Sequence, residues 1–255
     1  MGGLKRFVSE TQRMFFFSWK VIRACFGRPF YLSETFEQMY IAGYGSLWLV
    51  LLTGMMAGQA IALNFSNELG DFGAKTYLGR VMVLAIVREL GPTLTGIMVA
   101  ARVASGITAE IGSMKSSNQI DALKAFSIDP IRKLAVPRLL SLLIMVPALT
   151  IACDMVGLYG GFLIAKYHAH ISDALYWAPV WERLNFGNIS MGLIKPVIFA
   201  MIIAFVSIYK GFTSEGGAKG VGRATNQSVV ISSISILLAN FIITQAIFKF
   251  LKGYF

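Results

Sequence analysis

Five charged side chains lie within stretches of sequence that are otherwise apolar and long. They are Arg88, Glu89, Arg102, Asp154 and Lys195. A charged residue at the centre of a bilayer raises the free energy of insertion by ~2.5–3.5 kcal/mol. Such residues persist when they pair, face a water-filled cavity or contact a polar substrate. These five are therefore the first candidates for chemistry inside a membrane.

The spacing of Arg88 and Arg102 places two guanidinium groups near one helical face. They are fourteen residues apart, which in an ideal α-helix separates them by about 40°. A guanidinium matches phosphate through parallel hydrogen bonds, so one interpretation is a site for a phosphate-bearing substrate. In the structural alternative, Arg102 extends to the inner membrane surface and Arg88 pairs with a carboxylate such as Asp154.

Glu89 and Pro92 shape the chain around Arg88. Glu89 is the next residue, about 100° around the helix, so we do not expect it to neutralise Arg88 on one face. A structural polar role within the membrane is predicted for Glu89. Pro92 has no N–H to donate to the carbonyl of Arg88, and its ring crowds that carbonyl, which predicts a kink.

Three further polar residues have two interpretations each. Lys195 precedes Pro196 near the outer end of its stretch, and we expect its ammonium to extend to the outer head groups. The alternative is that it lines an outward-facing cavity. For Gln59 and Asp154, hydrogen bonding between helices is the first interpretation and substrate contact is the second.

The composition predicts an all-α membrane protein. The chain is 56% hydrophobic and 14% charged, whereas soluble domains contain about 25% charged residues. Five stretches reach the ~20 residues that a bilayer crossing needs, and residues 1–255 are expected to form a single domain. The predicted spans cover about residues 46–63, 78–108, 137–165, 191–210 and 228–249.

The net charge of +10 follows a membrane topology. Fourteen of the 23 basic residues precede span 1, or lie between spans 2 and 3 or spans 4 and 5, and only four lie in the other two connections. Cytosolic segments are enriched in Lys and Arg. The asymmetry therefore predicts a cytosolic N-terminus and, with five spans, a C-terminus on the opposite side. It does not indicate a nucleic-acid partner.

Small residues recur at every fourth position in two spans. They are Gly96, Ala100 and Ala104 in span 2, and Gly157 and Gly161 in span 3. This spacing lets helices approach backbone to backbone in lipid. Packing within one chain and a homodimer interface are both compatible with it.

Two polar segments have a helical pattern. Residues 4–27 combine aromatic and basic side chains, which predicts a helix lying in the membrane interface. In residues 110–125, Ile111 and Met114 alternate with Glu110 and Asp121. Because an amphipathic helix between two spans needs a surface to dock on, we expect a cytosolic partner there.

No catalytic, cofactor or metal site is expected in this chain. The glycine-rich loop SEGGAKGVGRATNQS is not a Walker motif, because Lys219 is followed by Gly220 and a membrane helix precedes it. HExxH and GxSxG motifs are absent. His168 and His170, in an outer connection, are expected to be solvated.

Separated motifs carry a family resemblance. They are RELGPTLTGIMVAARVASGITAEIGSMKSSNQIDALKAFSIDPIRKLAVPRLL, LIKPVIFA and YKGFTSEGGAKGVGRAT. Over residues 40–250 the chain resembles the MlaE permease family, the membrane subunits of ABC lipid transporters that work with MCE-domain proteins. Asn118 stands where family members often have Glu, so a charge contact with the ATPase is expected to be missing.

The resemblance implies a homodimeric, non-catalytic permease in the bacterial inner membrane, with a periplasmic C-terminus. It implies a cytosolic ABC ATPase dimer that binds ATP and Mg, a periplasmic MCE-domain hexamer and often a STAS-domain protein. The implied substrate is phospholipid, moved to or from the outer membrane. The segment 110–125 corresponds to the coupling helix, with Glu110, Ile111, Gly112, Met114, Gln119 and Asp121 as ATPase-coupling residues.

Candidate substrate-binding residues are Arg102, Lys195, Arg88 and Gln59. A different class of function is an ATP-independent channel or secondary transporter, in which Arg88, Glu89 and Asp154 relay ions. That alternative leaves the segment 110–125 without a purpose.

Overall fold

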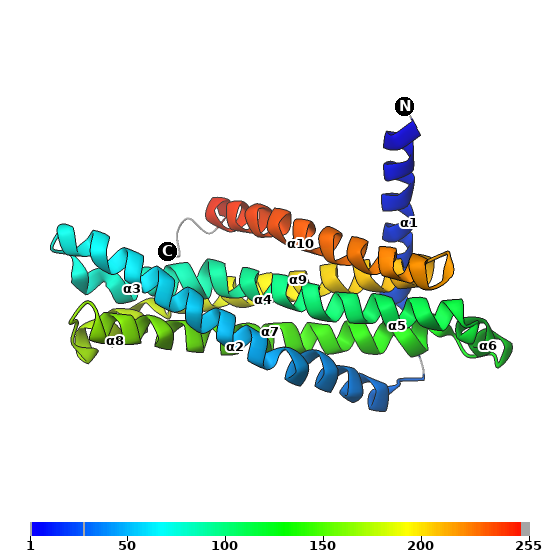
Figure 1. The fold of residues 1–255 in the computed structure, drawn as a ribbon, viewed down its shortest axis with the longest axis horizontal. Coiled ribbons are helices and arrows are strands. Elements are labelled where there is room, and N and C mark those ends of the chain that lie inside the picture. Colours follow the sequence, from blue (N-terminus) through cyan, green and yellow to red (C-terminus); the bar gives the residue numbers. More distant parts are fainter. Residues whose placement is uncertain (1, 28, 251–255) are drawn as a thin grey trace. The chain divides into compact units, whose positions relative to one another are not determined.

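The regular structure in the described residues, 2–27 and 29–250 of a computed structural model, is entirely helical (Figure 1). η1 is a 3₁₀-helix, and η2, η3 and η4 are π-helical. In chain order the elements are α1 (Gly2–Cys25), α2 (Leu32–Asp71), η1 (Lys75–Tyr77), α3 (Leu78–Met82), η2 (Val83–Leu90), α4 (Gly91–Val99), η3 (Ala100–Ala104), α5 (Ser105–Ser116), α6 (Gln119–Ala125), η4 (Ile131–Ala135), α7 (Val136–Tyr167), α8 (Asp173–Arg183), α9 (Phe186–Thr213) and α10 (Gly217–Phe250).

Five helical segments are long and apolar enough to cross a membrane, which confirms the predicted number of spans. They are Leu32–Asp71, Lys75–Ser116, Ile131–Tyr167, Phe186–Thr213 and Gly217–Ile247. Most extend beyond the predicted bounds, because a helix can continue into polar residues after its apolar stretch has ended. The helix expected over residues 4–27 is α1.

The contacts divide the chain into two compact units. Unit 1 contains Met1–Tyr44, Val99–Met145 and Ala200–Ser235, and unit 2 contains Gly45–Met98, Val146–Phe199 and Ile236–Phe255. Each of the five spanning segments supplies one part to each unit.

The second spanning segment is interrupted by two π-helical stretches. η2 includes Arg88 and Glu89, and η3 includes Arg102. π-Helical turns are rare and frequently occur at functional sites. The ideal period of 3.6 residues does not hold between Arg88 and Arg102, so the predicted angle of about 40° between them does not apply.

In unit 2, α2 and α7 approach backbone to backbone. A Cβ atom on Gly58 would collide with the carbonyl oxygen of Gly157, and one on Gly160 would lie 2.6 Å from that of Met55. Gly161 faces Met82 and the hydroxyl of Tyr176. The expected close packing at Gly157 and Gly161 is therefore found within the chain.

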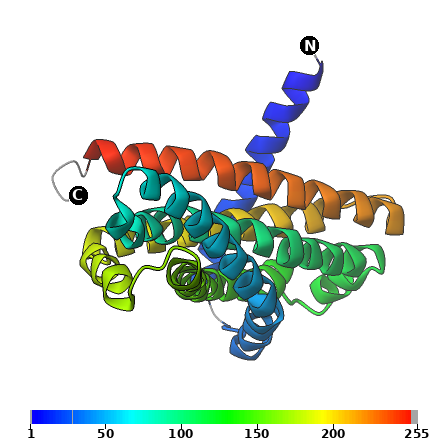
Figure 2. The same cartoon turned by 60° about the vertical axis from the view of Figure 1, so that its left-hand side comes forward.

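A helix that the sequence analysis did not anticipate lies in the connection between the third and fourth spans. This helix, α8, packs against α3 (Figure 2). Its Tyr176 is fully buried and donates a hydrogen bond of 2.8 Å to the carbonyl of Leu158. Burial raises the pKa of this hydroxyl. His168 and His170, just before α8, are exposed as predicted.

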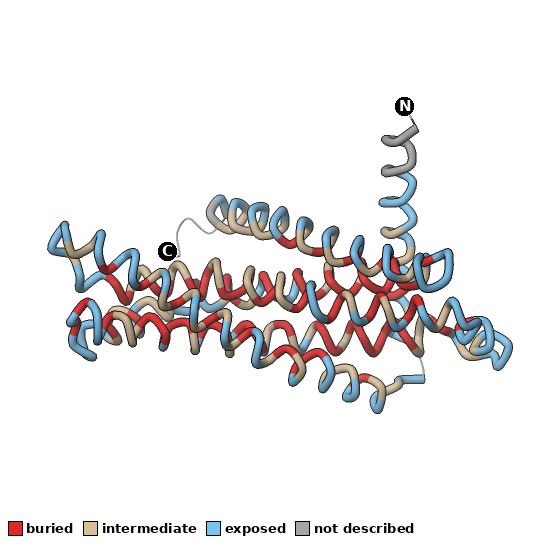
Figure 3. The backbone as a smooth tube through the Cα atoms, viewed as in Figure 1, coloured by how far each residue is buried: buried red, intermediate tan, exposed pale blue. Residues whose placement is uncertain are grey.

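Burial differs among the spanning helices (Figure 3). In the most apolar part of α9, 50% of residues are buried, whereas the corresponding part of α10 is 17% buried. The exposed side chains of α10 include Ile234, Leu238 and Phe241. In a membrane protein such a surface is available to lipid or to another subunit.

We predict that Gly58→Ala destabilises the protein by about 1–3 kcal/mol, because the added methyl group would meet backbone atoms that cannot move aside. Thermal unfolding of the purified chain in detergent measures the effect. Gly106→Ala on α5 is the control, since nothing beyond its chain neighbours and the backbone of its own helix lies within 4 Å of the position that its added methyl group would take and alanine favours a helix. Equal losses of stability in both variants would contradict this account of α2–α7 packing.

Candidate functional site: an intramembrane charged cluster and a helical elbow

Lys195 on α9 is buried among polar groups of the second spanning segment in unit 2. Its side chain is 1% exposed, and its ammonium donates hydrogen bonds of 2.7 Å to Glu89 Oε2 and 2.8 Å to the carbonyl of Arg88. The expectation that Lys195 extends to the outer head groups is therefore wrong. A nearby carboxylate provides better compensation for its charge than a path to the membrane surface.

The backbone carbonyl of Arg88 receives no hydrogen bond from Pro92. An α-helical residue at position 92 would normally donate its N–H there, and proline has none. The ammonium of Lys195 occupies that place. The proline thus leaves a backbone acceptor to which Lys195 of α9 donates.

Arg88 pairs with its own neighbour. Its Nε lies 3.8 Å from Glu89 Oε1, and its side chain is 10% exposed. The expectation that Glu89 does not neutralise Arg88 on one face is wrong, because both side chains are long and the local backbone is π-helical. We call Arg88, Glu89 and Lys195 the charged cluster.

Asp154 is not the carboxylate that pairs with Arg88 in the structure, although the sequence analysis offered it as a possible partner. It is buried, and among the described residues its Oδ1 has no hydrogen-bond partner. It lies so close to α4 that a Cβ atom on Gly91 would collide with Oδ1. Asp154 thus sits against the start of α4.

Two side chains of α10 also lie within hydrogen-bonding distance of Glu89. Asn240 Nδ2 lies 3.4 Å from Glu89 Oε2, and Thr244 Oγ1 lies 3.3 Å from Glu89 Oε1. Neither residue was singled out in the sequence. Both are polar residues within an apolar span, which is the signal that could have identified them.

The charged cluster carries two cations and one carboxylate. Glu89 is 33% exposed at its side chain, whereas both cationic side chains are buried. An approaching phosphate would meet an excess of positive charge, but Glu89 would have to move before Lys195 could bind it. The arrangement is suited to replacement of the Glu89 carboxylate by a phosphate rather than to a permanently open anion site.

The other two candidates for substrate binding lie outside this cluster. Gln59 is half-buried on α2, with its side chain near Gly160 of α7, as expected for contact between helices. Arg102 is exposed on η3 and belongs to unit 1. The structure therefore gathers Arg88 and Lys195, but not Gln59, around Glu89.

In unit 1, the predicted helix over residues 110–125 is two helices. α5 ends at Ser116, α6 begins at Gln119, and Asn118 between them has a left-handed backbone with φ 58°. Asparagine tolerates this conformation better than most residues. Asn118 therefore has a conformational role in the turn. We call α5, the turn at 117–118 and α6 the elbow.

The proposed coupling residues divide into buried and accessible ones. Ile111 is fully buried, and Gly112 lies against Ser214 and Val221. Gln119 and Asp121 are exposed on α6, and Met114 is half-buried. Only the accessible residues are available to another protein.

Glu110 is tied to the third spanning segment. Its carboxylate lies 2.7 Å from the guanidinium of Arg138, whose side chain is 4% exposed. Substituting Glu110 would leave a buried charge without its partner, so it has a structural role besides any contact with another protein.

Phe126 follows α6 and is 77% exposed. The sequence analysis did not select it, although a phenylalanine beside a short polar helix is a recognisable signal. An exposed aromatic side chain of this kind is a typical anchor in a protein interface.

Five spanning helices with charged residues inside them define a polytopic helical membrane protein. In the part of the chain that the structure describes, no group of three or more His, Cys, Asp or Glu side chains could hold a metal ion. Residues 35–246 match the family described as "Permease MlaE". The chain belongs to the MlaE permease family.

The chain is similar to several proteins over most of its length. A "Probable ABC transporter permease protein" of Rickettsia typhi is 39% identical, over 91% of this chain and 90% of the relative. The "Intermembrane phospholipid transport system permease protein MlaE" of Haemophilus influenzae is 32% identical, over 83% and 82%. A "Probable ABC transporter permease protein" of Synechocystis is 35% identical, over 85% and 82%.

We predict that Glu89 and Lys195 stabilise the fold jointly. In a double-mutant cycle, Glu89→Gln and Lys195→Met should each destabilise the chain, and the double variant should lose about 1–3 kcal/mol less than the sum. Thermal unfolding in detergent supplies the values. The exposed pair Arg80 and Glu182, 3.1 Å apart, is the control and should couple by less than about 1 kcal/mol. Additive losses at Glu89 and Lys195 would refute their pairing.

Proposed function

We propose that this chain is the membrane-spanning, non-catalytic subunit of an ATP-driven phospholipid transporter in the bacterial inner membrane. The observation that carries this proposal is the charged cluster, placed inside the apolar spans of a chain whose Haemophilus relative is named for intermembrane phospholipid transport. Phosphate is the anionic part of such a lipid, and the cluster offers an excess of positive charge within an apolar surrounding.

The proposed assembly is a homodimer of this chain with a cytosolic ABC ATPase dimer and a periplasmic MCE-domain hexamer, in some systems with a STAS-domain protein. Relatives named as ABC transporter permeases support the ATPase. The weakly buried α10 supports contact with lipid or a second copy. ATP and Mg would bind to the ATPase, and the lipid would move between the inner membrane and a periplasmic path that serves outer-membrane lipid homeostasis.

The charge distribution supports the orientation in this proposal. The basic residues of α1, the elbow and the α9–α10 connection belong on the cytosolic side by the positive-inside rule. The elbow would then face the ATPase, and the C-terminus would be periplasmic. Within the elbow, Gln119, Asp121 and the adjoining Phe126 provide the accessible contact surface.

Transport in proteoliposomes tests the function. The chain, reconstituted with its ATPase, should move a fluorescent phospholipid only when ATP is supplied. Lys195→Met should lower the initial rate at least about tenfold, the equivalent of about 1.4 kcal/mol of lost charge interaction. Lys166→Met, at an exposed lysine of α7, should leave the rate within twofold. Flux at the full rate without ATP, driven by an ion gradient, would instead favour the ion-relay alternative.

The contact with the ATPase has its own test. Asp121→Lys combined with Phe126→Ser should abolish co-purification of the ATPase, because both side chains are exposed and their replacement leaves the packing of the chain intact. The control is Phe72→Ser between α2 and η1, at a side chain that is 81% exposed. Retention of the ATPase by the α6 variant would remove the elbow from the proposed interface.

A further inference from the structure

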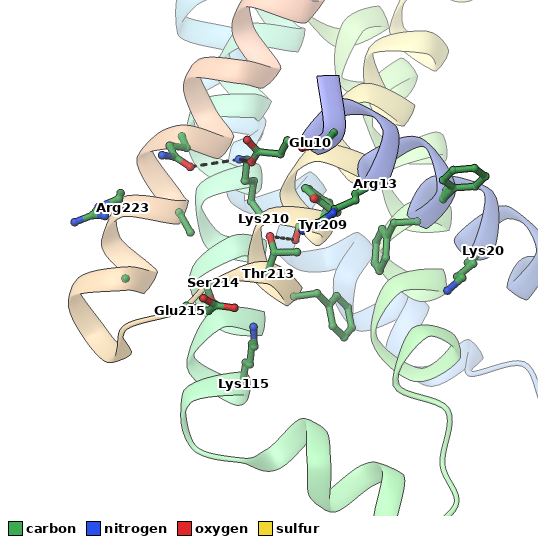
Figure 4. A pocket seen from close by; sticks show the side chains of 17 residues that line it. Glu10, Arg13, Lys20, Lys115, Tyr209, Lys210, Thr213, Ser214, Glu215 and Arg223 are labelled. Carbon is green, nitrogen blue, oxygen red and sulfur yellow. Dashed lines mark hydrogen bonds and ion pairs between the residues drawn. The ribbon is translucent and has the colours of Figure 1, made fainter. Parts of the chain in front are cut away.

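A pocket of about 960 Å³ lies in unit 1 between α1, the end of α9 and the start of α10 (Figure 4). Basic side chains from four helices line it: Arg13, Lys20, Lys115, Lys210 and Arg223. The carboxylates in its lining are those of Glu10 and Glu215. The lining, which we call the basic pocket, therefore carries an excess of positive charge.

One of these charges is already compensated. Lys210 is buried, and its ammonium lies 2.5 Å from Glu10 Oε1 and 3.3 Å from Gln227 Oε1. Among the side chains that the structure describes, Lys20, Lys115 and Arg223 form no hydrogen bond or ion pair. Unlike Lys195, they do not have to release a protein carboxylate before binding an anion.

Aromatic rings form the apolar part of the same pocket. Phe17 packs against Tyr209 and Phe212, with ring centroids 5.8 Å and 5.6 Å apart, and Phe16 also lines the pocket. On the same helix, Trp19 is exposed. A basic helix with exposed aromatic side chains is typical of the membrane interface.

The pocket lies where two spanning helices end and begin. α9 ends at Thr213 and α10 begins at Gly217, so this position corresponds to the head-group region rather than to the hydrocarbon core. Basic pockets beside membrane helices are suited to the head groups of anionic lipids. The neighbouring rings would contact the glycerol and the upper acyl carbons, which a soluble anion lacks.

We propose that the basic pocket binds the phosphate head group of an anionic phospholipid that remains on the protein, separate from any lipid that is transported. Lys115 contacts the phosphate, Lys20 and Arg223 add positive charge from opposite sides of the pocket (Figure 4), and Phe16 contacts the apolar part. The bound lipid connects α1 to the end of α9 and the start of α10, where the Glu10–Lys210 pair already joins α1 to α9. This inference requires only that the pocket lies at the membrane surface and does not depend on the proposed transport function.

Lipid binding to the full-length chain in neutral detergent tests the proposal. Native mass spectrometry measures its affinity for short-chain phosphatidylglycerol and phosphatidylcholine. Phosphatidylglycerol should bind at least about tenfold more tightly, and Lys115→Gln combined with Arg223→Gln should remove this preference, because charge-assisted hydrogen bonds are lost. The control, Lys124→Gln combined with Lys219→Gln, makes the same change in charge at exposed residues outside the basic pocket. Its affinity for phosphatidylglycerol should stay within twofold of that of the unmodified chain.

Three results would overturn the proposal. One is unchanged phosphatidylglycerol affinity in a pocket variant whose thermal unfolding is normal. Another is competition by inorganic phosphate or glycerol phosphate at the concentrations at which the lipid itself binds, which would indicate a soluble anion. The third is that the pocket variant, Lys115→Gln combined with Arg223→Gln, no longer co-purifies with the ATPase but binds lipid with unaltered affinity, which would identify the pocket as a protein-docking surface.

Discussion

The ammonium of Lys195 is the group on which the polar arrangement of unit 2 depends. It satisfies two needs at once: the carboxylate of Glu89 and the Arg88 carbonyl that Pro92 leaves without its usual donor. An unpaired charge at the centre of a span costs ~2.5–3.5 kcal/mol on insertion scales. α9 and the second spanning segment are therefore joined by an electrostatic contact within an otherwise apolar bundle. A buried ion pair contributes little net stability compared with apolar packing of the same volume, whereas removal of one partner alone is strongly destabilising.

Each unit carries a different candidate feature. Unit 2 holds a carboxylate between two cations, an arrangement that a phosphate could enter by displacing Glu89. Unit 1 holds the elbow, whose buried Ile111 packs against Gly211 while α6 offers exposed side chains. A force applied to α6 would be passed to α5 and the end of α9 through this tight packing. α5 and Arg88 belong to the same spanning segment, Lys75–Ser116.

Sequence reasoning found the features that depend on local composition. The five spans and the helix α1 follow from apolar length and amphipathic pattern, and the cost of charge in lipid directs attention to Arg88, Glu89 and Lys195. It failed where the answer depends on which helices face each other. Lys195 was expected at the membrane surface, because its partner is more than a hundred residues away in the chain. The angle between Arg88 and Arg102 was calculated for a regular α-helix and missed two π-helical stretches. The turn at Asn118 divides a segment whose periodicity suggested one helix, since a single left-handed residue leaves little trace in an apolar pattern.

Photo-crosslinking tests the central claim, that phospholipid reaches the charged cluster. A phospholipid with a photoreactive head group would be added to the purified transporter, irradiated with and without ATP, and its adducts mapped by mass spectrometry. The account predicts adducts on the peptide around Glu89 and on the part of α10 that contains Asn240 and Thr244, with yields that change when ATP is hydrolysed. Lys195→Met should reduce them. Adducts confined to other, lipid-exposed segments, with none at the cluster under either condition, would contradict it.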